Sequence, residues 1–253
     1  MRKISMLAAI AFMVTQVWGQ KDNGRIPLIG DTAPSFTSES TVGTINFPQD
    51  YANSWKIIFS HPRDFTPVCS SELLELAYMQ NDFNELNVKL LVLSTDLLSQ
   101  HFSWKKALEE IEYKGNPTTK IEFPLVPDDE FKISRLYGML HTPVSTTRDV
   151  RGVYIIDPDN VIRSIIFYPM EVGRNIDEIK RTIIALQTTR ENNLVVTPAN
   201  WEPGGDVLLH HLTYENMAKL ERLDPSVYQV SWFMTFKQAE PAELGSLESS
   251  FKY

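Results

Sequence analysis

The single cysteine of this chain, Cys69, lies where a buried strand meets a helix. Residues 55–60 form a short apolar run of the kind found in buried strands. From residue 70 to 87, apolar side chains recur with helical spacing. Pro67 fits the first helical position, where a missing N–H has no consequence, and Thr66 then becomes the N-cap. The thiol is therefore expected in the first helical turn, where the helix dipole stabilises the reactive thiolate.

A lone cysteine is more often a small buried hydrophobic residue than a nucleophile. Here the position at a helix start, with Thr66 three residues before Cys69, favours a nucleophile. A single cysteine also rules out an internal disulfide and a cysteine cluster for zinc or an iron–sulfur centre. The thiol is therefore either free and reactive or paired with another chain.

The residues around Cys69 resemble the active-site signature of the peroxiredoxins. Pro62-x-x-x-Thr66-x-x-Cys69 looks like that signature, and the longer string FSHPRDFTPVC at residues 59–69 is similar to the one-cysteine subgroup. The resemblance covers about residues 29–237. It implies a thiol-dependent peroxidase for hydrogen peroxide and organic hydroperoxides, with no cofactor and no metal. Since there is no second cysteine, an external thiol has to reduce the sulfenic acid formed at Cys69.

The predicted elements follow an α/β order. A strand, a helix and a second apolar strand at residues 88–94 predict a parallel crossover unit. Segments 152–157 and 161–167, joined by a Pro-Asp-Asn turn, predict a β-hairpin. Further predicted elements are a strand near 44–47, a helix at 97–113 capped by Asp96, a helical turn at 130–137 and an amphipathic helix at 175–190. Together with the resemblance, this order predicts a thioredoxin-like fold.

The chain is expected to divide into four segments. These are an export signal at residues 1–19, a thioredoxin-like peroxidase domain at 29–190, a C-terminal domain at 197–237 and a polar tail at 238–253. Pro198, Pro203 and Gly204 mark the boundary between the two domains. The C-terminal domain is predicted to hold strands at 206–212 and 229–236 around a helical turn at 214–221. The resemblance implies that this small α+β domain helps to form a homodimer.

The first residues have the three parts of an export signal. Arg2 and Lys3 give a basic start, residues 4–14 form an apolar core, and Val17 and Gly19 precede a cleavage site after Gly19. The core is too short to act as a stable membrane anchor. We therefore expect a periplasmic or secreted protein. Losing Arg2 and Lys3 takes the net charge from −8 to −10, which disfavours nucleic acid and anionic membranes as partners.

The resemblance assigns roles to the residues close to Cys69. Cys69 itself is the nucleophile that attacks the peroxide. Thr66 is expected to hydrogen-bond the thiolate or the peroxide through its hydroxyl, unless it serves as a plain N-cap. Pro62 is expected to shape and dry the pocket, unless it is an ordinary turn proline.

The family site is completed by an arginine from far along the chain, just before a strand that ends in Asp-Pro. Arg151, followed by residues 152–156 and then by Asp157 and Pro158, fits that description. Arg148 is the competing residue. Strand position favours Arg151, since site residues gather at strand ends in open α/β sheets. A guanidinium there would stabilise the thiolate and orient oxygen atoms.

His61 and Glu72 are supporting residues with two interpretations each. His61 either hydrogen-bonds near the thiolate or is a satisfied buried histidine. Glu72, one helical turn after Cys69, either orients the arginine or favours the positive end of the helix.

Other functions find less support. A non-catalytic thioredoxin-like binding protein could lack Thr66 or Arg151, but both are present. Some one-cysteine members have phospholipase activity at a Gly-x-Ser-x-Gly serine; here Ser54 lacks both glycines and the upstream histidine, so a serine hydrolase is doubtful. A metal site at His210 and His211 lacks a third ligand, and adjacent strand side chains point to opposite faces.

Overall fold

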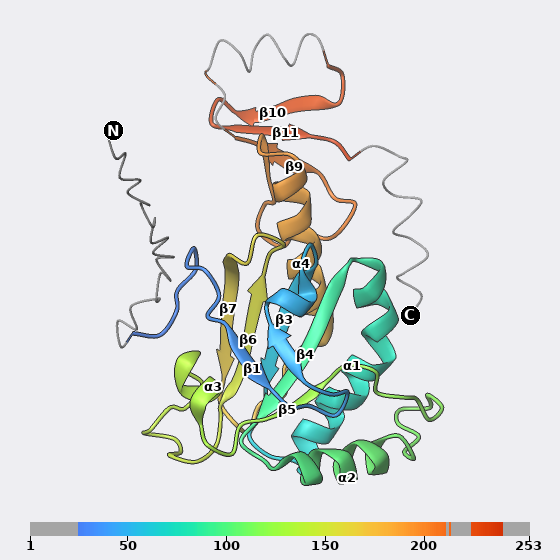
Figure 1. Ribbon diagram of the computed structural model, residues 1–253. Helices are drawn as coiled ribbons and strands as arrows, with labels where there is room; N and C mark the ends of the chain where they lie inside the picture. Colours follow the sequence, from blue (N-terminus) through green and yellow to red (C-terminus); the bar gives the residue numbers. More distant parts are fainter. Residues whose placement is uncertain (1–24, 211–212, 214–223, 240–253) are drawn as a thin grey trace, which may run out of the picture.

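The structure of the chain is a computed structural model that describes residues 25–210, 213 and 224–239. Its centre is a five-stranded sheet with the strand order β5-β4-β3-β6-β7 (Figure 1). The strands are β3 (Trp55–Ser60), β4 (Val88–Ser94), β5 (Leu125–Pro127), β6 (Arg151–Ile156) and β7 (Ile162–Tyr168). The first three are parallel, and β6 joins β3 in the antiparallel sense. The predicted crossover unit and the predicted β6–β7 hairpin are both confirmed.

Both faces of this sheet are covered, which explains why β3 is mostly apolar and is buried at every position. On one face, Ile57 and Phe59 pack against helices α1 (Pro67–Glu85) and α4 (Ile176–Glu191). On the other face, Ile58 packs with the small hairpin of β1 (Phe36–Ser38) and β2 (Ile45–Phe47). The remaining helices of the described part of the chain are η1 (Gln49–Tyr51), α2 (Leu98–Leu108) and α3 (Lys132–Leu136).

Helix α2 differs from its prediction at both ends. The carboxylate of Asp96 does not cap it, because that carboxylate accepts hydrogen bonds from the backbone N–H of Asp64 and the hydroxyl of Ser94. The N-cap is Leu97. The helix stops at Leu108, and the next residue, Glu109, accepts a hydrogen bond from the N–H of Ile121 at 2.9 Å. This contact anchors the following loop where further helix was predicted.

The C-terminal segment forms a second sheet with the order β10-β11-β9-β8. Its strands are β8 (Val195–Val196), β9 (Val207–Leu209), β10 (Val227–Ser231) and β11 (Met234–Lys237). The single strand predicted at 229–236 was wrong, because the chain turns at Trp232 and Phe233 to make a hairpin. Trp201 attaches this segment to α4, packing on Ile184 and Ala185. The helical turn predicted at 214–221 lies outside the described residues.

Among the helices that the described residues form, none is long and apolar enough to cross a membrane. The predicted signal at 1–19 and most of the tail at 238–253 are not among the residues that the structure describes.

Asp149 is a buried acid in the loop that leads into β6. Within the described residues, neither of its carboxylate oxygens has a well-formed hydrogen bond. Burial raises the pKa of Asp149 to about 8, against the opposing effect of the Ser134 hydroxyl, and the nearby Asp128 and Asp96 carboxylates add to the increase. Asp149 is therefore held largely as the neutral acid at neutral pH.

Replacing Asp149 with asparagine is expected to stabilise the protein at alkaline pH. Because the pKa of folded Asp149 lies above its ordinary value of 3.8, its stabilising contribution is full below that value and is lost as the pH rises towards 8. Asparagine is always neutral, so it avoids the cost of keeping the buried carboxyl protonated, which grows by about 1.4 kcal/mol per pH unit between the ordinary and the raised pKa. The gain in the free energy of unfolding should therefore be about 2–4 kcal/mol larger at pH 8 than at pH 5. Urea unfolding at pH 5 and pH 8 measures this, with the exposed neighbour Asp129→Asn as control. An equal effect at both pH values contradicts the prediction.

Candidate active site

Cys69 lies fully buried in the first turn of α1, in the position that the sequence predicts. Pro67 is the first helical residue, and Thr66 is the N-cap with extended backbone. The first intrahelical hydrogen bond runs from the N–H of Ser70 to the carbonyl of Thr66. The N–H groups of Val68 and Cys69, in the first turn, therefore have no intrahelical acceptor. Phe65 makes the turn into the helix possible by adopting a positive φ of 56°.

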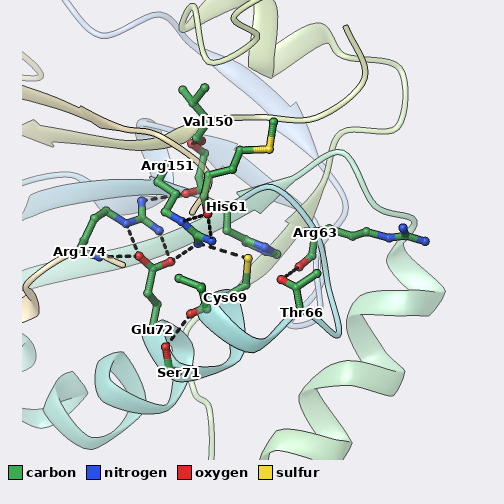
Figure 2. Close-up of polar contacts among 12 residues, drawn as sticks. His61, Arg63, Thr66, Cys69, Ser71, Glu72, Val150, Arg151 and Arg174 are labelled. Atoms are coloured by element: carbon green, nitrogen blue, oxygen red, sulfur yellow. Dashed lines mark hydrogen bonds and ion pairs between the residues drawn. The ribbon is translucent and has the colours of Figure 1, made fainter. Parts of the chain in front are cut away.

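The Thr66 hydroxyl makes its hydrogen bond in this structure to the loop that precedes the helix. It does not cap the helix through its side chain. Instead it donates to the carbonyl of Arg63 at 2.9 Å (Figure 2). Since its proton is used there, the oxygen of Thr66 is left as an acceptor. Pro62 is buried in the same turn, between β3 and α1.

Arg151, the first residue of β6, brings a buried guanidinium to the sulfur. Its Nη1 lies 3.3 Å from Cys69 Sγ, and Figure 2 shows the contact between these two side chains. The guanidinium is oriented by the carbonyl of Met170, which accepts from Nε at 2.8 Å and also from Nη2. The competing Arg148 is exposed on the preceding loop. The structure thus brings Arg151 and Cys69 together across 82 residues of chain.

Glu72 lies one turn after Cys69 on the same buried face of α1 and binds two arginines. Its Oε2 accepts from Arg151 Nη1 at 2.7 Å and from Arg174 Nη2 at 2.8 Å. Its Oε1 accepts from the backbone N–H and the Nε of Arg174. Of its two predicted roles, the geometry matches the orientation of the arginine.

Arg174 is a site residue that the sequence analysis missed. It lies in the loop before α4, and its Nη1 donates to the carbonyls of Ser60 and Gly152, each at 2.8 Å. Its guanidinium also stacks 3.2 Å from the ring centre of Phe59, a cation–π contact. Arg174 therefore links the end of β3 and the start of β6 to Glu72. The same carboxylate also accepts from Arg151, whose guanidinium contacts the sulfur.

The charges in this group are one carboxylate and two guanidinium groups, all buried. Burial alone would raise the pKa of Glu72, but the hydrogen bonds and charge of Arg174, together with the charge of Arg151, lower it below 4.5. Burial lowers the pKa of Arg174, and its bonds to Glu72 oppose that change. Glu72 is therefore ionised at neutral pH, and the group has a net positive charge next to Cys69.

His61 is fully buried at the start of the turn, and it packs against Trp104 with ring centres 5.0 Å apart. Burial lowers the pKa of His61 to about 4, against the opposing effect of Asp64. Its Nε2 lies 3.6 Å from Asp64 Oδ1, beyond hydrogen-bond distance, while Asp64 Oδ2 is bonded by His101 at 2.8 Å. Within the described residues neither ring nitrogen of His61 has a hydrogen-bond partner. At neutral pH, then, His61 is a neutral imidazole.

Two other predicted positions do not join this site. Ser54 lies at the opposite end of β3, where its hydroxyl donates to the side-chain oxygen of Asn87 at 2.9 Å, not to a histidine. His210 is described and exposed, whereas His211 lies outside the described residues. Among the residues that are described, no group of three or more acidic, histidine or cysteine side chains could hold a metal ion.

Two family models match this chain. The model of the AhpC/TSA family matches residues 29–165, and the model of the C-terminal domain of 1-Cys peroxiredoxin matches residues 185–219. Among curated proteins, a peroxiredoxin from Methanosarcina mazei is 45% identical over 84% of this chain and 98% of its own length. A 1-Cys peroxiredoxin from Dictyostelium discoideum is 38% identical over 78% of this chain and 79% of its own.

Solved structures give a consistent result. A yeast mitochondrial 1-Cys peroxiredoxin superposes with a TM-score of 0.73 at 33% identity, over 84% of this chain and 99% of that chain. A cysteine-to-serine mutant of peroxiredoxin 6 from Arenicola marina superposes with a TM-score of 0.74 at 30% identity, over 85% of this chain and 99% of that chain. The predicted thioredoxin-like α/β fold is thereby confirmed, together with a C-terminal domain that contains strands.

Proposed function

Because this chain belongs to the peroxiredoxins, in their one-cysteine subgroup, and is a thiol-dependent peroxidase, we propose that Cys69 is its peroxide-reducing residue and Arg151 its main partner. One observation carries the assignment: the Nη1 of Arg151 lies 3.3 Å from the buried sulfur of Cys69. A fixed positive charge at that distance stabilises the thiolate, and the thiolate is the nucleophilic form. No other cysteine exists in the chain to take this role.

The reaction begins when the Cys69 thiolate attacks one oxygen of the peroxide. A sulfur–oxygen bond forms while the oxygen–oxygen bond breaks, so the sulfur is oxidised to a sulfenic acid and the peroxide is reduced to water or an alcohol. Negative charge grows on the departing oxygen, which takes up a proton from water, equal to the one that the thiol released when it ionised. Arg151 and the free N–H groups of Val68 and Cys69 are the positive groups next to this charge.

Thr66 and Pro62 complete the pocket in this proposal. The hydroxyl of Thr66 donates to Arg63, so its oxygen can accept a hydrogen bond from the O–H of the peroxide. This bond holds the peroxide with its reacting oxygen towards the sulfur. Pro62, buried beside the turn, helps to exclude water from the thiolate. Hydrogen peroxide and small organic hydroperoxides both carry the required O–H group.

The sulfenic acid has to be reduced by a thiol from another molecule, because Cys69 is the only cysteine. A first external thiol forms a mixed disulfide with Cys69 and releases water. A second thiol then releases reduced Cys69 and leaves as a disulfide. The yeast mitochondrial relative resolves its thiol via the glutathione and thioredoxin systems, so glutathione and thioredoxin are the reductants to test first.

Rapid mixing of the reduced protein with hydrogen peroxide tests this function. We expect a fast second-order reaction, and intact mass should show one added oxygen atom on Cys69. Cys69→Ser is the control for reaction elsewhere in the chain. A reaction as slow as that of an ordinary free thiol would contradict the proposal and favour a thioredoxin-like binding protein.

The homodimer and the export of the protein also belong to this proposal. The match to the C-terminal domain of 1-Cys peroxiredoxin supports a dimer, and sedimentation that gives a monomer at micromolar concentration would contradict it. The basic start at Arg2 and Lys3, followed by an apolar core, supports export to the periplasm or the exterior. N-terminal sequencing of exported material should begin after Gly19, and a start at Met1 would argue against cleavage.

A further inference from the structure

Ser60, the last residue of β3, is a fully buried serine whose hydroxyl has no role in the site described above. Its hydroxyl donates to the carbonyl of Val150 at 2.8 Å. The same oxygen accepts a hydrogen bond from the N–H of Gly152 at 2.9 Å. These two groups belong to the peptide bonds on either side of Arg151. We propose that Ser60 is the positioning residue that aims the Arg151 side chain at Cys69.

The hydroxyl acts at the place where regular pairing between β3 and β6 ends. The antiparallel register reaches Phe59 opposite Val153 and goes no further. The next pair would be Ser60 and Gly152, but the N–H of Gly152 is shared between the Ser60 hydroxyl and the carbonyl of Val150, which lies 3.0 Å away in the same turn. Where the β3–β6 ladder stops, the Ser60 hydroxyl therefore joins the two peptide groups of this turn, one on each side of Arg151.

Holding both flanking peptide groups fixes the backbone of Arg151. The orientation of these two peptide planes sets φ and ψ of Arg151, and therefore the direction of its Cα–Cβ bond. The far end of the side chain is held separately, by the carbonyl of Met170 and by Glu72. Ser60 fixes the backbone end of the Arg151 side chain, and the Met170 carbonyl and Glu72 fix its guanidinium.

The close packing around Gly152 supports this role. A Cβ atom at position 152 would lie 3.0 Å from Ser60 Oγ and 3.1 Å from the ring of Phe167. The backbone of β6 therefore approaches the serine closely enough for the hydroxyl to reach both peptide groups. The carbonyl of Ser60 also accepts from Arg174, but that bond uses the main chain and remains after the side chain is changed.

The inference rests on the proposed role of Arg151, and a double-mutant cycle tests it. Ser60→Ala should lower the second-order rate constant with hydrogen peroxide by about 10- to 100-fold, the scale of loss for a misplacement of about 1 Å. In an Arg151→Met background, Ser60→Ala should lower this rate constant by less than about twofold, because no guanidinium is left to position. An equal loss in both backgrounds would overturn the inference.

Ser54→Ala is the matched control for loss of a buried serine hydroxyl, since Ser54 lies at the other end of β3 and bonds Asn87. It should lower the melting temperature without changing the rate constant.

If Ser60→Ala does not fold, Ser60→Thr and Ser60→Val form a pair of equal shape that differs in the hydroxyl. The threonine variant should then react faster than the valine variant, and equal rates would overturn the inference. A slow wild-type protein would overturn the proposed function itself.

Discussion

Replacing Arg151 with methionine is expected to slow the reaction of Cys69 with hydrogen peroxide by about 10²–10³-fold, the usual cost of removing one preorganised donor. Methionine keeps much of the side-chain length but cannot donate to Cys69 Sγ or to the carbonyl of Met170. Both the thiolate and the departing oxygen lose their fixed positive charge. Rapid mixing over a range of peroxide concentrations gives the rate constant directly.

Arg148→Met is the matched control for this change. Arg148 lies three residues earlier, is exposed and is the arginine that competed with Arg151 in the sequence. Its loss should leave the rate constant within about twofold of wild type, as expected for a surface change. A large loss in Arg148→Met, or an unchanged rate in Arg151→Met, would contradict the assignment of Arg151. Glu72 keeps its bonds to Arg174 in Arg151→Met, so the variant should still fold.

The sequence predicts the part of the site that lies within one local turn. Thr66, Pro67 and Cys69 are placed by helix-start chemistry, which depends on neighbours along the chain. For the arginine, the resemblance implies one just before a strand that ends in Asp-Pro, and strand position favours Arg151 over Arg148. The predicted helix at 97–113 was too long, because Asp96 and Glu109 are engaged by groups distant in sequence. Tertiary contacts of this kind leave no local pattern.

Arg174, Ser60 and the carbonyl of Met170 could not be assigned from local pattern alone. The predicted β-hairpin nevertheless contained the signal for two of them. A hairpin returns the chain to its starting point, and here Tyr168 at the end of β7 pairs with Arg151 at the start of β6. Residues shortly after Tyr168 therefore had to lie beside Arg151. The hydroxyl of Ser60 left no such signal, because its role depends on where the β3–β6 ladder stops.

The buried ions of the site explain why function and stability are linked in this chain. Arg151 is useful to the sulfur only when its charge is fixed and close, yet a buried guanidinium is costly without a partner. Glu72 supplies that partner, and Arg174 is bonded to the same carboxylate. Removing the carboxylate charge therefore leaves two buried guanidinium groups with only the Cys69 sulfur nearby to balance them.

Glu72→Gln is accordingly expected to be the most destabilising conservative change in the site. Breaking a buried ion pair from one side costs about 3–5 kcal/mol. For a chain of this size, that corresponds to a fall in melting temperature of roughly 6–20 °C. Glu75→Gln is the control on the same helix, because Glu75 pairs with Lys114 at the surface and should cost no more than about 1 kcal/mol. Thermal unfolding of both variants at pH 7 makes the comparison.

The pH dependence of the melting temperature shows whether Glu72→Gln acts through the lost charge or through a general packing defect. Because the pKa of folded Glu72 lies below 4.5, its stabilising contribution is present above that value and is lost as the pH falls through the folded pKa. The difference in melting temperature between wild type and Glu72→Gln should therefore narrow as the pH falls below about 4.5, because Glu72 takes up a proton in the unfolded chain before it does so in the folded protein. A difference that stays constant down to pH 3 would mean that the amide disturbs packing, and that the carboxylate charge does not hold the two arginines in place.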